Sequence, residues 1–275
     1  MPSFRPAFQI YTIRHTAPKD FPEMCRRLAG MGYKGAELTD MRGIMPAADL
    51  KQLGTDCGLT WLSVHVALEE MESKLDSLME YYRSAGITRL VCPWLHPRRR
   101  KTRCDWVATA ESLGKIARRM GSAGMTLIYH HHDFEFHPIR ESPADGGGFA
   151  DAFDLLDRCT PEQSLKFELD TYWLEFVGIA TADFIGRYPH RLALLHCKDM
   201  AVGPERRYAP VGAGRLNWPH ILSAVQNAGL DWLIVEQDEC YGRPPVDCLA
   251  QSLTYLKQFN YGIITPSDSS PVEDG

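Results

Sequence analysis

Short β-rich runs alternate with longer helical patterns along most of this chain, and this alternation strongly constrains the fold. Strands that alternate with helices form βαβ units, which assemble into a parallel sheet. We expect eight strands, at residues 8–13, 33–38, 60–66, 89–92, 126–131, 165–170, 193–197 and 232–236.

Several of these strands are apolar throughout, notably at 127–128, 192–195 and 233–235. Such runs are typical of parallel strands that are buried on both faces. A doubly wound sheet that binds a dinucleotide would carry a G-x-G-x-x-G motif after its first strand, and this chain has none there. We therefore predict an α/β protein with a single (β/α)₈ TIM barrel over residues 1–264. The polar, acidic residues 265–275 are expected to form a disordered C-terminal tail.

Composition narrows the expected location and partners. The formal net charge is −5, whereas proteins whose main partner is nucleic acid usually present a basic surface. No apolar run approaches the roughly 18–20 residues that span a bilayer. The eight cysteines are scattered without a C-x-x-C pair, as in reduced thiols of cytoplasmic proteins. The sequence thus predicts a cytoplasmic protein with a small-molecule partner, without nucleic acid or membrane.

Polar side chains collect where the predicted strands end, and in a TIM barrel those ends carry function. Carboxylates together with one or two imidazoles suit Mn²⁺, Mg²⁺, Co²⁺ or Zn²⁺. One such ion would polarise a substrate carbonyl, and two carboxylates would move a proton beside it. The candidates at these ends include Glu37, His65, His130, His132, Glu135, Asp170, His196, Lys198 and Glu236.

Six segments carry a resemblance to a known family. They are GYKGAEL at 32–38, YHHHDFEF at 129–136, FELDTYW at 167–173, LHCKDM at 195–200, VGAGRLNW at 211–218 and IVEQD at 234–238. In this order and spacing, over most of the chain, the sequence resembles the sugar phosphate isomerase/epimerase families of the xylose-isomerase-like TIM barrel superfamily.

The resemblance implies one divalent metal ion held by a Glu, an Asp, a His and a second Glu from strands five to eight. Asp170, His196 and Glu236 match the last three ligands. The end of strand five holds His130 where family members carry a plain Glu. We expect Glu135, in the turn that follows, to be the strand-five ligand, and His130 is the alternative. Glu236 and Glu135, or His130, would then exchange the proton.

Other residues are expected to bind substrate. Glu37 and His65 are placed at the barrel mouth, Trp173 is expected to wall the pocket, and Arg215 to lie beside it. Each of these has a structural alternative, such as local hydrogen bonding or core packing. Lys198 is expected to bind a substrate oxygen or phosphate, or else to form an ion pair with Asp199 or Glu168. His132 is a candidate substrate ligand or acid/base group, and His131 should point away because side chains alternate along a strand.

The function that follows from the resemblance is a metal-dependent sugar isomerase or epimerase acting on a keto-sugar. The alternative is a lyase or dehydratase that acts on a cyclitol ketone or 3-oxo-glycoside with the same metal site. A remote alternative is an apurinic-site endonuclease, which shares the barrel superfamily. A homo-oligomer is expected from the same resemblance.

Overall fold

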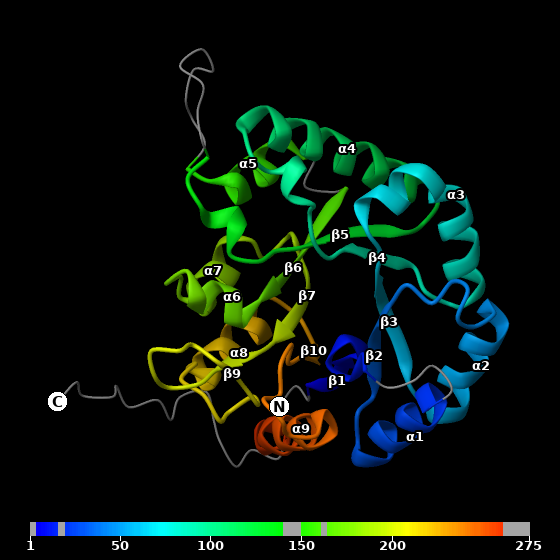
Figure 1. The fold of residues 1–275 in the computed structure, drawn as a ribbon, viewed down its shortest axis with the longest axis vertical. Helices are drawn as coiled ribbons and strands as arrows, with labels where there is room; N and C mark the ends of the chain where they lie inside the picture. The colour runs from blue at the N-terminus through cyan, green and yellow to red at the C-terminus, as the bar shows by residue number, and fades with distance from the viewer. Residues whose placement is uncertain (1–3, 16–19, 140–149, 161–163, 261–275) are drawn as a thin grey trace.

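The computed structural model describes residues 4–15, 20–139, 150–160 and 164–260 (Figure 1). Within these residues, eight parallel strands close into a barrel in the order β1-β2-β3-β4-β5-β6-β7-β10, which confirms the predicted TIM barrel. The expected tail at 265–275 lies outside the described residues. The strands are β1 (Arg5–Gln9), β2 (Gly35–Thr39), β3 (Thr60–His65), β4 (Arg89–Cys92), β5 (Thr126–His130), β6 (Leu165–Asp170), β7 (Leu192–Cys197) and β10 (Trp232–Val235).

Helices surround the strands, as Figure 1 shows. They are α1 (Phe21–Met31), α2 (Ala47–Cys57), α3 (Leu68–Ser84), α4 (Arg103–Ser122), α5 (Ala152–Cys159), α6 (Thr171–Phe176), α7 (Thr181–Arg187), α8 (Trp218–Asn227) and α9 (Pro245–Asn260), with the 3₁₀ turns η1 (Ile10–Ile13), η3 (Pro97–Arg99) and η4 (Phe134–Phe136). Among the described residues, no helix has both the length and the apolar character needed to span a bilayer.

The strands are apolar on both sides because they pack against two separate cores. A large core lies between the strands and the helices. A small one fills the barrel interior and includes Ala7, Ile128, Leu194 and Ile234. Side chains two positions further along a strand point the same way. The next inward-facing position on each of these strands is therefore polar. These residues are Gln9, His130, His196 and Glu236.

Two segments depart from the sequence-based expectation. The first strand ends at Gln9 rather than at residue 13, because the Gln9 side chain accepts a hydrogen bond from the backbone N–H of Tyr11 and the chain turns into η1. The pattern predicts one helix, at 182–188, between strands six and seven, but α6 precedes α7 there. Asp170 begins α6 as its N-cap, with Oδ1 accepting hydrogen bonds from the N–H groups of Tyr172 and Trp173.

Candidate metal centre

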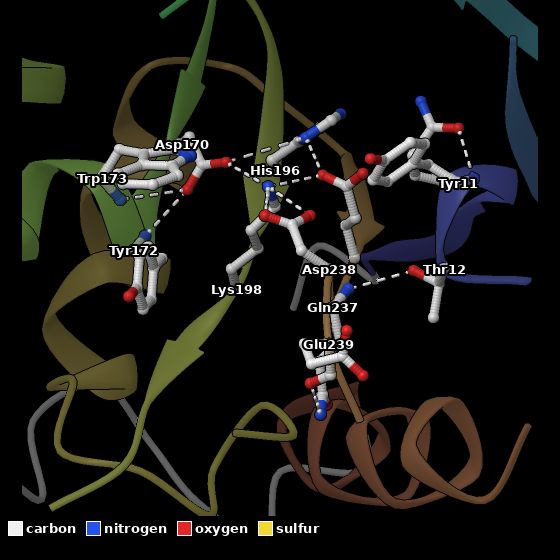
Figure 2. Close-up of polar contacts among 12 residues, drawn as sticks. Tyr11, Thr12, Asp170, Tyr172, Trp173, His196, Lys198, Gln237, Asp238 and Glu239 are labelled. Atoms are coloured by element: carbon white, nitrogen blue, oxygen red, sulfur yellow. Dashed lines mark hydrogen bonds and ion pairs between the residues drawn. The ribbon is translucent and has the colours of Figure 1, made fainter. Parts of the chain in front are cut away.

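Two groups of potential metal ligands meet inside the C-terminal end of the barrel and share His196. One group, among the described residues, contains Glu37, His65, Glu168 and His196, and the other contains His130, Asp170 and His196. Within each group the candidate ligand atoms lie within 4.8 Å of one another. Figure 2 shows His196 between Asp170 and the strand that leads to Gln237.

Strand register brings these residues to one level. Asp170 of β6 lies opposite His196 of β7, and His130 of β5 lies opposite Glu168 of β6. Glu236 follows β10 two positions after Ile234, which is itself paired with His196. The sequence separation is large, but neighbouring parallel strands place these side chains beside each other in the barrel interior.

The two ring nitrogens of His196 face different surroundings. Nε2 lies 2.5 Å from Oε2 of Glu37, and Nδ1 lies 2.8 Å from Oε2 of Glu236. Glu37 also accepts hydrogen bonds from Ser63 Oγ at 2.5 Å and from Gln9 Nε2 at 2.7 Å. Both carboxylate oxygens of Glu37 thus already contact protein donors. Glu37 fixes the His196 ring through Nε2, so that Nδ1 of His196 faces Asp170 and Glu236.

The second group has the donor types of a cation site. Asp170 Oδ2 and His196 Nδ1 have no hydrogen-bond partner among the described residues, although Lys198 and Glu236 lie close to them at ion-pair distance. Two imidazoles and two carboxylates suit a divalent transition metal. His130, Asp170 and His196 thus form a candidate donor set, and Glu236 adds a carboxylate 2.8 Å from Nδ1 of His196.

Protonation in the site follows burial and neighbouring charge. Burial raises the pKa of Asp170 to about 6, against the opposing effect of Lys198 and His196. Burial also acts to raise the pKa of Glu236, but Lys198 and His196 outweigh it and hold this pKa well below its usual range. Burial, with His196 as a further cause, lowers the pKa of His130. Near pH 7 both carboxylates are ionised and His130 is neutral, which are the forms that bind metal.

His196 differs from His130 in its charge. Burial acts to lower its pKa, but Glu168, Glu236 and Glu37 together hold it well above the usual value. His196 is therefore protonated without metal, and metal binding at Nδ1 would release a proton.

Lys198 joins the carboxylates on the pocket side of the site. Its ammonium lies 2.7 Å from Glu236 Oε2, 3.0 Å from Asp170 Oδ2 and 3.1 Å from Asp238 Oδ1. The ion pair foreseen for Lys198 is present, but with these carboxylates rather than with Asp199 or Glu168. Lys198 also lines the pocket, so its expected contact with substrate is compatible with the geometry.

A cavity of about 630 Å³ opens above the candidate ligands, within the range of about 300–1,000 Å³ that is usual for small-molecule sites. Its lining contains five residues expected from the sequence, namely His65, His130, His132, Lys198 and Glu236. The lining also includes Tyr11, Thr39, Pro93, Trp94, Tyr208 and Asp238. Figure 2 shows Tyr11 and Trp173 on opposite sides of His196.

Glu135, the expected strand-five ligand, does not join either group. Its carboxylate accepts hydrogen bonds from the Tyr129 hydroxyl at 2.5 Å and from the backbone N–H of His132 at 2.9 Å. Tyr129 precedes His130 on β5 and so points away from the barrel interior, into the core beneath the helices. The geometry therefore favours the alternative, because His130 is the strand-five residue that lies beside Asp170 and His196.

Three further expected substrate contacts lie outside the pocket lining. Arg215 pairs with Glu175 at 3.0 Å and its side chain is half exposed. The Trp173 ring packs against His132, with 5.4 Å between ring centroids, and so stands behind the pocket wall. Glu37 is fully buried below His196. The expectation for His131 is confirmed, because its Nε2 accepts a hydrogen bond from the Asp170 N–H, among aromatic rings of the outer core.

The sequence reasoning named Glu168 only as a possible ion-pair partner of Lys198 and not as a residue of the metal centre. Glu168 precedes Asp170 by two positions on β6, and this spacing on a strand is a signal that both side chains share one face. Tyr208 had no such signal, because it reaches the pocket from the short hairpin of β8 (Asp199–Met200) and β9 (Tyr208–Ala209).

The fold and the site together define a TIM-barrel protein with a candidate metal centre at the C-terminal ends of its strands. The chain belongs to the xylose isomerase-like TIM barrel family, whose sequence profile matches residues 20–259. The resemblance inferred from the six sequence segments is thereby confirmed.

Individual relatives are distant. The chain is 21% identical to inosose dehydratase of Clostridium botulinum in an alignment of 234 positions that covers 78% of this chain and 69% of that protein. A sugar phosphate isomerase/epimerase from Parabacteroides distasonis has a similar structure, with a TM-score of 0.78 and 22% identity over 93% of this chain and 94% of that one. The IolI protein with a bound zinc atom gives a TM-score of 0.70 and 15% identity over 94% and 98% of the two chains. These structural likenesses describe the fold.

Proposed function

We propose that this protein is an enzyme that moves a proton at the carbon beside the carbonyl of a keto-sugar, and so isomerises or epimerises that sugar. One observation carries the proposal: the Glu236 carboxylate, itself one of the candidate metal ligands, lies in the pocket wall 2.7 Å from the Lys198 ammonium. A base, a positive charge and a cation site are thus available to one bound ketone.

His130, Asp170, His196 and Glu236 would hold the divalent ion in this proposal. When bound, the ion would polarise the ketone oxygen and make the neighbouring C–H more acidic. The relative named IolI, which contains zinc, supports a divalent ion here. Manganese, magnesium, cobalt and zinc all remain candidates on the donor types alone.

The chain's own side chains divide the remaining work. Glu236 is ionised and so can accept the proton from carbon. His132 lines the same pocket and is neutral, because burial and then the charge of Lys198 lower its pKa well below the usual value. We assign His132 as the second group in proton transfer, in place of Glu135. Lys198 and Asp238 would bind the substrate hydroxyls.

Dehydration of a cyclitol ketone or 3-oxo-glycoside is the second candidate, and two observations favour it. The sequence relative in Clostridium botulinum is named inosose dehydratase. In addition, Lys198 provides an ammonium beside Glu236, so that Glu236 would take the proton from carbon while Lys198 protonates the departing hydroxyl. Both candidates share the first step and differ in whether the proton returns to carbon or water is lost.

The test is proton exchange with solvent. The purified protein, loaded in turn with Mn²⁺, Co²⁺, Mg²⁺ and Zn²⁺, would be incubated in D₂O with a panel of keto-sugars, cyclitol ketones and 3-oxo-glycosides. Deuterium at carbon, seen by NMR, reports isomerisation or epimerisation, and absorbance of a conjugated enone reports dehydration. Exchange by the wild type should fall by about 10²-fold or more in Glu236→Gln.

Glu239→Gln is the matched control, since Glu239 lies on the same segment and its side chain is mostly exposed. It should keep full activity. Unchanged exchange in Glu236→Gln, or no reaction with any metal and substrate of the panel, would overturn the proposal.

Three sequence-based expectations stay predictions, namely a cytoplasmic location, a homo-oligomer and the absence of nucleic acid and membrane partners. The net charge of −5 weighs against the remote alternative of an apurinic-site endonuclease, because duplex binding usually relies on a basic surface.

A further inference from the structure

Glu168 lies at the centre of three imidazoles directly beneath the candidate metal centre. Its Oε2 is 3.1 Å from His130 Nδ1, 3.2 Å from His196 Nε2 and 3.2 Å from His65 Nε2. The side chain is fully buried. Its Oε1 has no hydrogen-bond partner among the described residues. Among the described residues, the polar side chains around the Glu168 carboxylate are therefore these three imidazoles.

His130 has one nitrogen on each side of this arrangement. Nδ1 lies 3.1 Å from Oε2 of Glu168 but makes no hydrogen bond among the described residues, whereas Nε2 lies 3.7 Å from Oδ2 of Asp170. An imidazole that binds metal through one nitrogen usually donates the N–H of the other to a carboxylate, which sets the tautomer and strengthens the metal bond. We propose that Glu168 is a positioning residue that keeps the proton of His130 on Nδ1 and so presents Nε2 to the cation.

The comparison with Glu37 shows why this role falls to Glu168. Glu37 stands behind His196 in the same way, but Ser63 and Gln9 also donate to it and share its negative charge. No serine or glutamine donor of this kind reaches Glu168 among the described contacts. The carboxylate therefore faces all three imidazoles at nearly equal distances, and His130 is the one of them that comes from the neighbouring strand β5 and lies opposite Glu168.

Glu168 is assigned a place behind the ligand rather than in the ligand set. His130 occupies the space between Glu168 and the Asp170 side of the site, because its two nitrogens face these two carboxylates. Loss of a group behind a ligand typically weakens metal binding by about 10–100-fold. This inference rests on the metal site of the proposed function.

The experiment compares metal affinity in wild type, Glu168→Gln and Glu135→Gln, measured by competition with a chromophoric chelator for Zn²⁺ and Co²⁺. Glu168→Gln keeps the shape and removes the charge, so we expect one ion per chain bound about 10–100-fold more weakly. Glu135→Gln is the matched control, because Glu135 is an equally buried carboxylate that faces Tyr129 instead of an imidazole. Its affinity should equal that of the wild type.

Unchanged affinity in Glu168→Gln would overturn the inference. Complete loss of the ion, as in Asp170→Ala, would also overturn it, since Glu168 would then be a ligand itself. If the wild type binds no metal, the proposed function fails first, and this outcome is distinct from both.

A second measurement needs no variant. In the zinc-loaded wild type, ¹⁵N NMR of the histidine rings should show His130 with a proton on Nδ1 and zinc on Nε2, with His130→Gln supplying the assignment. Zinc on Nδ1 of His130 would overturn the inference, even if Glu168→Gln did not fold.

Discussion

His130 and Glu135 lie five positions apart in the sequence, but their side chains reach different parts of the molecule. His130 points into the barrel beside Asp170, whereas the Glu135 carboxylate is held by Tyr129 and the backbone of His132. The carboxylate of Glu135 is the ligand expected from the resemblance, because family members carry a Glu at strand five. The direction of each side chain relative to the barrel wall decides between them.

Substitution of these two residues should therefore affect the metal differently. We expect His130→Ala to weaken binding of the divalent ion by more than about 100-fold, beyond the roughly 10–100-fold typical of groups behind a ligand. Glu135→Gln should leave the affinity unchanged. Isothermal titration with Mn²⁺ or Zn²⁺ measures both variants. The reverse result would restore Glu135 as the strand-five ligand.

Glu135 should instead make stability depend on pH. Burial raises its pKa from 4.5 to about 7, although Tyr129 and the His132 N–H act to lower it. A carboxyl group whose folded pKa is raised stabilises the fold fully below its unfolded pKa. That contribution is lost as pH rises from about 4.5 through about 7. The loss is about 3 kcal/mol at 1.36 kcal/mol per pKa unit.

Glu135→Gln can keep both hydrogen bonds without ionising, because its carbonyl accepts from His132 and its amide donates to the Tyr129 oxygen. Urea unfolding at pH 4.5 and pH 8 should show the wild type losing about 3 kcal/mol relative to this variant. A constant difference between the two proteins across this range would contradict the raised pKa.

At the scale of elements, the segment between β7 and α8 is organised by one buried carboxylate. Asp199 Oδ1 accepts from the N–H groups of Met200 and Leu216. Its Oδ2 accepts from the backbone of Gly212 and Gly214 and from the Trp218 indole, and these are Gly and Trp residues of the VGAGRLNW motif. At Gly214 a Cβ would lie 2.2 Å from Asp199 Oδ1, so the motif requires glycine there.

These five hydrogen bonds predict that the isosteric substitution Asp199→Asn lowers the free energy of unfolding strongly. In Asp199→Asn the amide NH₂ replaces one oxygen and faces at least two N–H donors, whichever way it turns. We expect a loss of at least about 2 kcal/mol in the free energy of unfolding, since hydrogen bonds to charged groups contribute about 1.5–3 kcal/mol each. The unfolding midpoint should fall by roughly 4 °C or more.

The matched control for this variant is Asp76→Asn, because the Asp76 side chain is largely exposed and pairs with Arg119 on the surface. Its effect should stay within about 0.5 kcal/mol. Differential scanning calorimetry of both variants compares them directly, and equal midpoints would show that Asp199 does not hold the segment.

At the scale of the whole molecule, the candidate ligands come from β5, β6, β7 and the end of β10, so a bound ion would link four strands of the barrel. Binding to the folded chain alone stabilises it by about 2.7 kcal/mol at 100 times the dissociation constant. For a chain of this size that corresponds to roughly 5–10 °C in the midpoint.

We therefore expect added Mn²⁺ or Zn²⁺ to raise the unfolding midpoint of the chelator-treated protein by roughly 5–10 °C. Asp170→Ala should abolish this increase while leaving the folded structure in circular dichroism. If added metal did not change the unfolding midpoint of the wild type, this result would contradict the proposed metal centre.

The sequence by itself determined the architecture, because periodicity and apolar character are local properties. Eight β-rich runs with helices between them, and runs such as 192–195 that must be buried on both faces, leave few alternatives to a closed parallel barrel. The same pattern placed Asp170, His196 and Glu236 at strand ends, where the barrel brings them together.

Only the tertiary structure decided what each polar residue at the rim faces. Whether Glu135 or His130 belongs to the ligands depends on which side of the barrel wall each occupies after a turn, and no local pattern specifies that. Strand register placed Glu168 opposite His130 and beneath three imidazoles. Likewise, Tyr208 reaches the pocket through a hairpin whose position depends on Asp199, a contact between residues distant from one another along the chain.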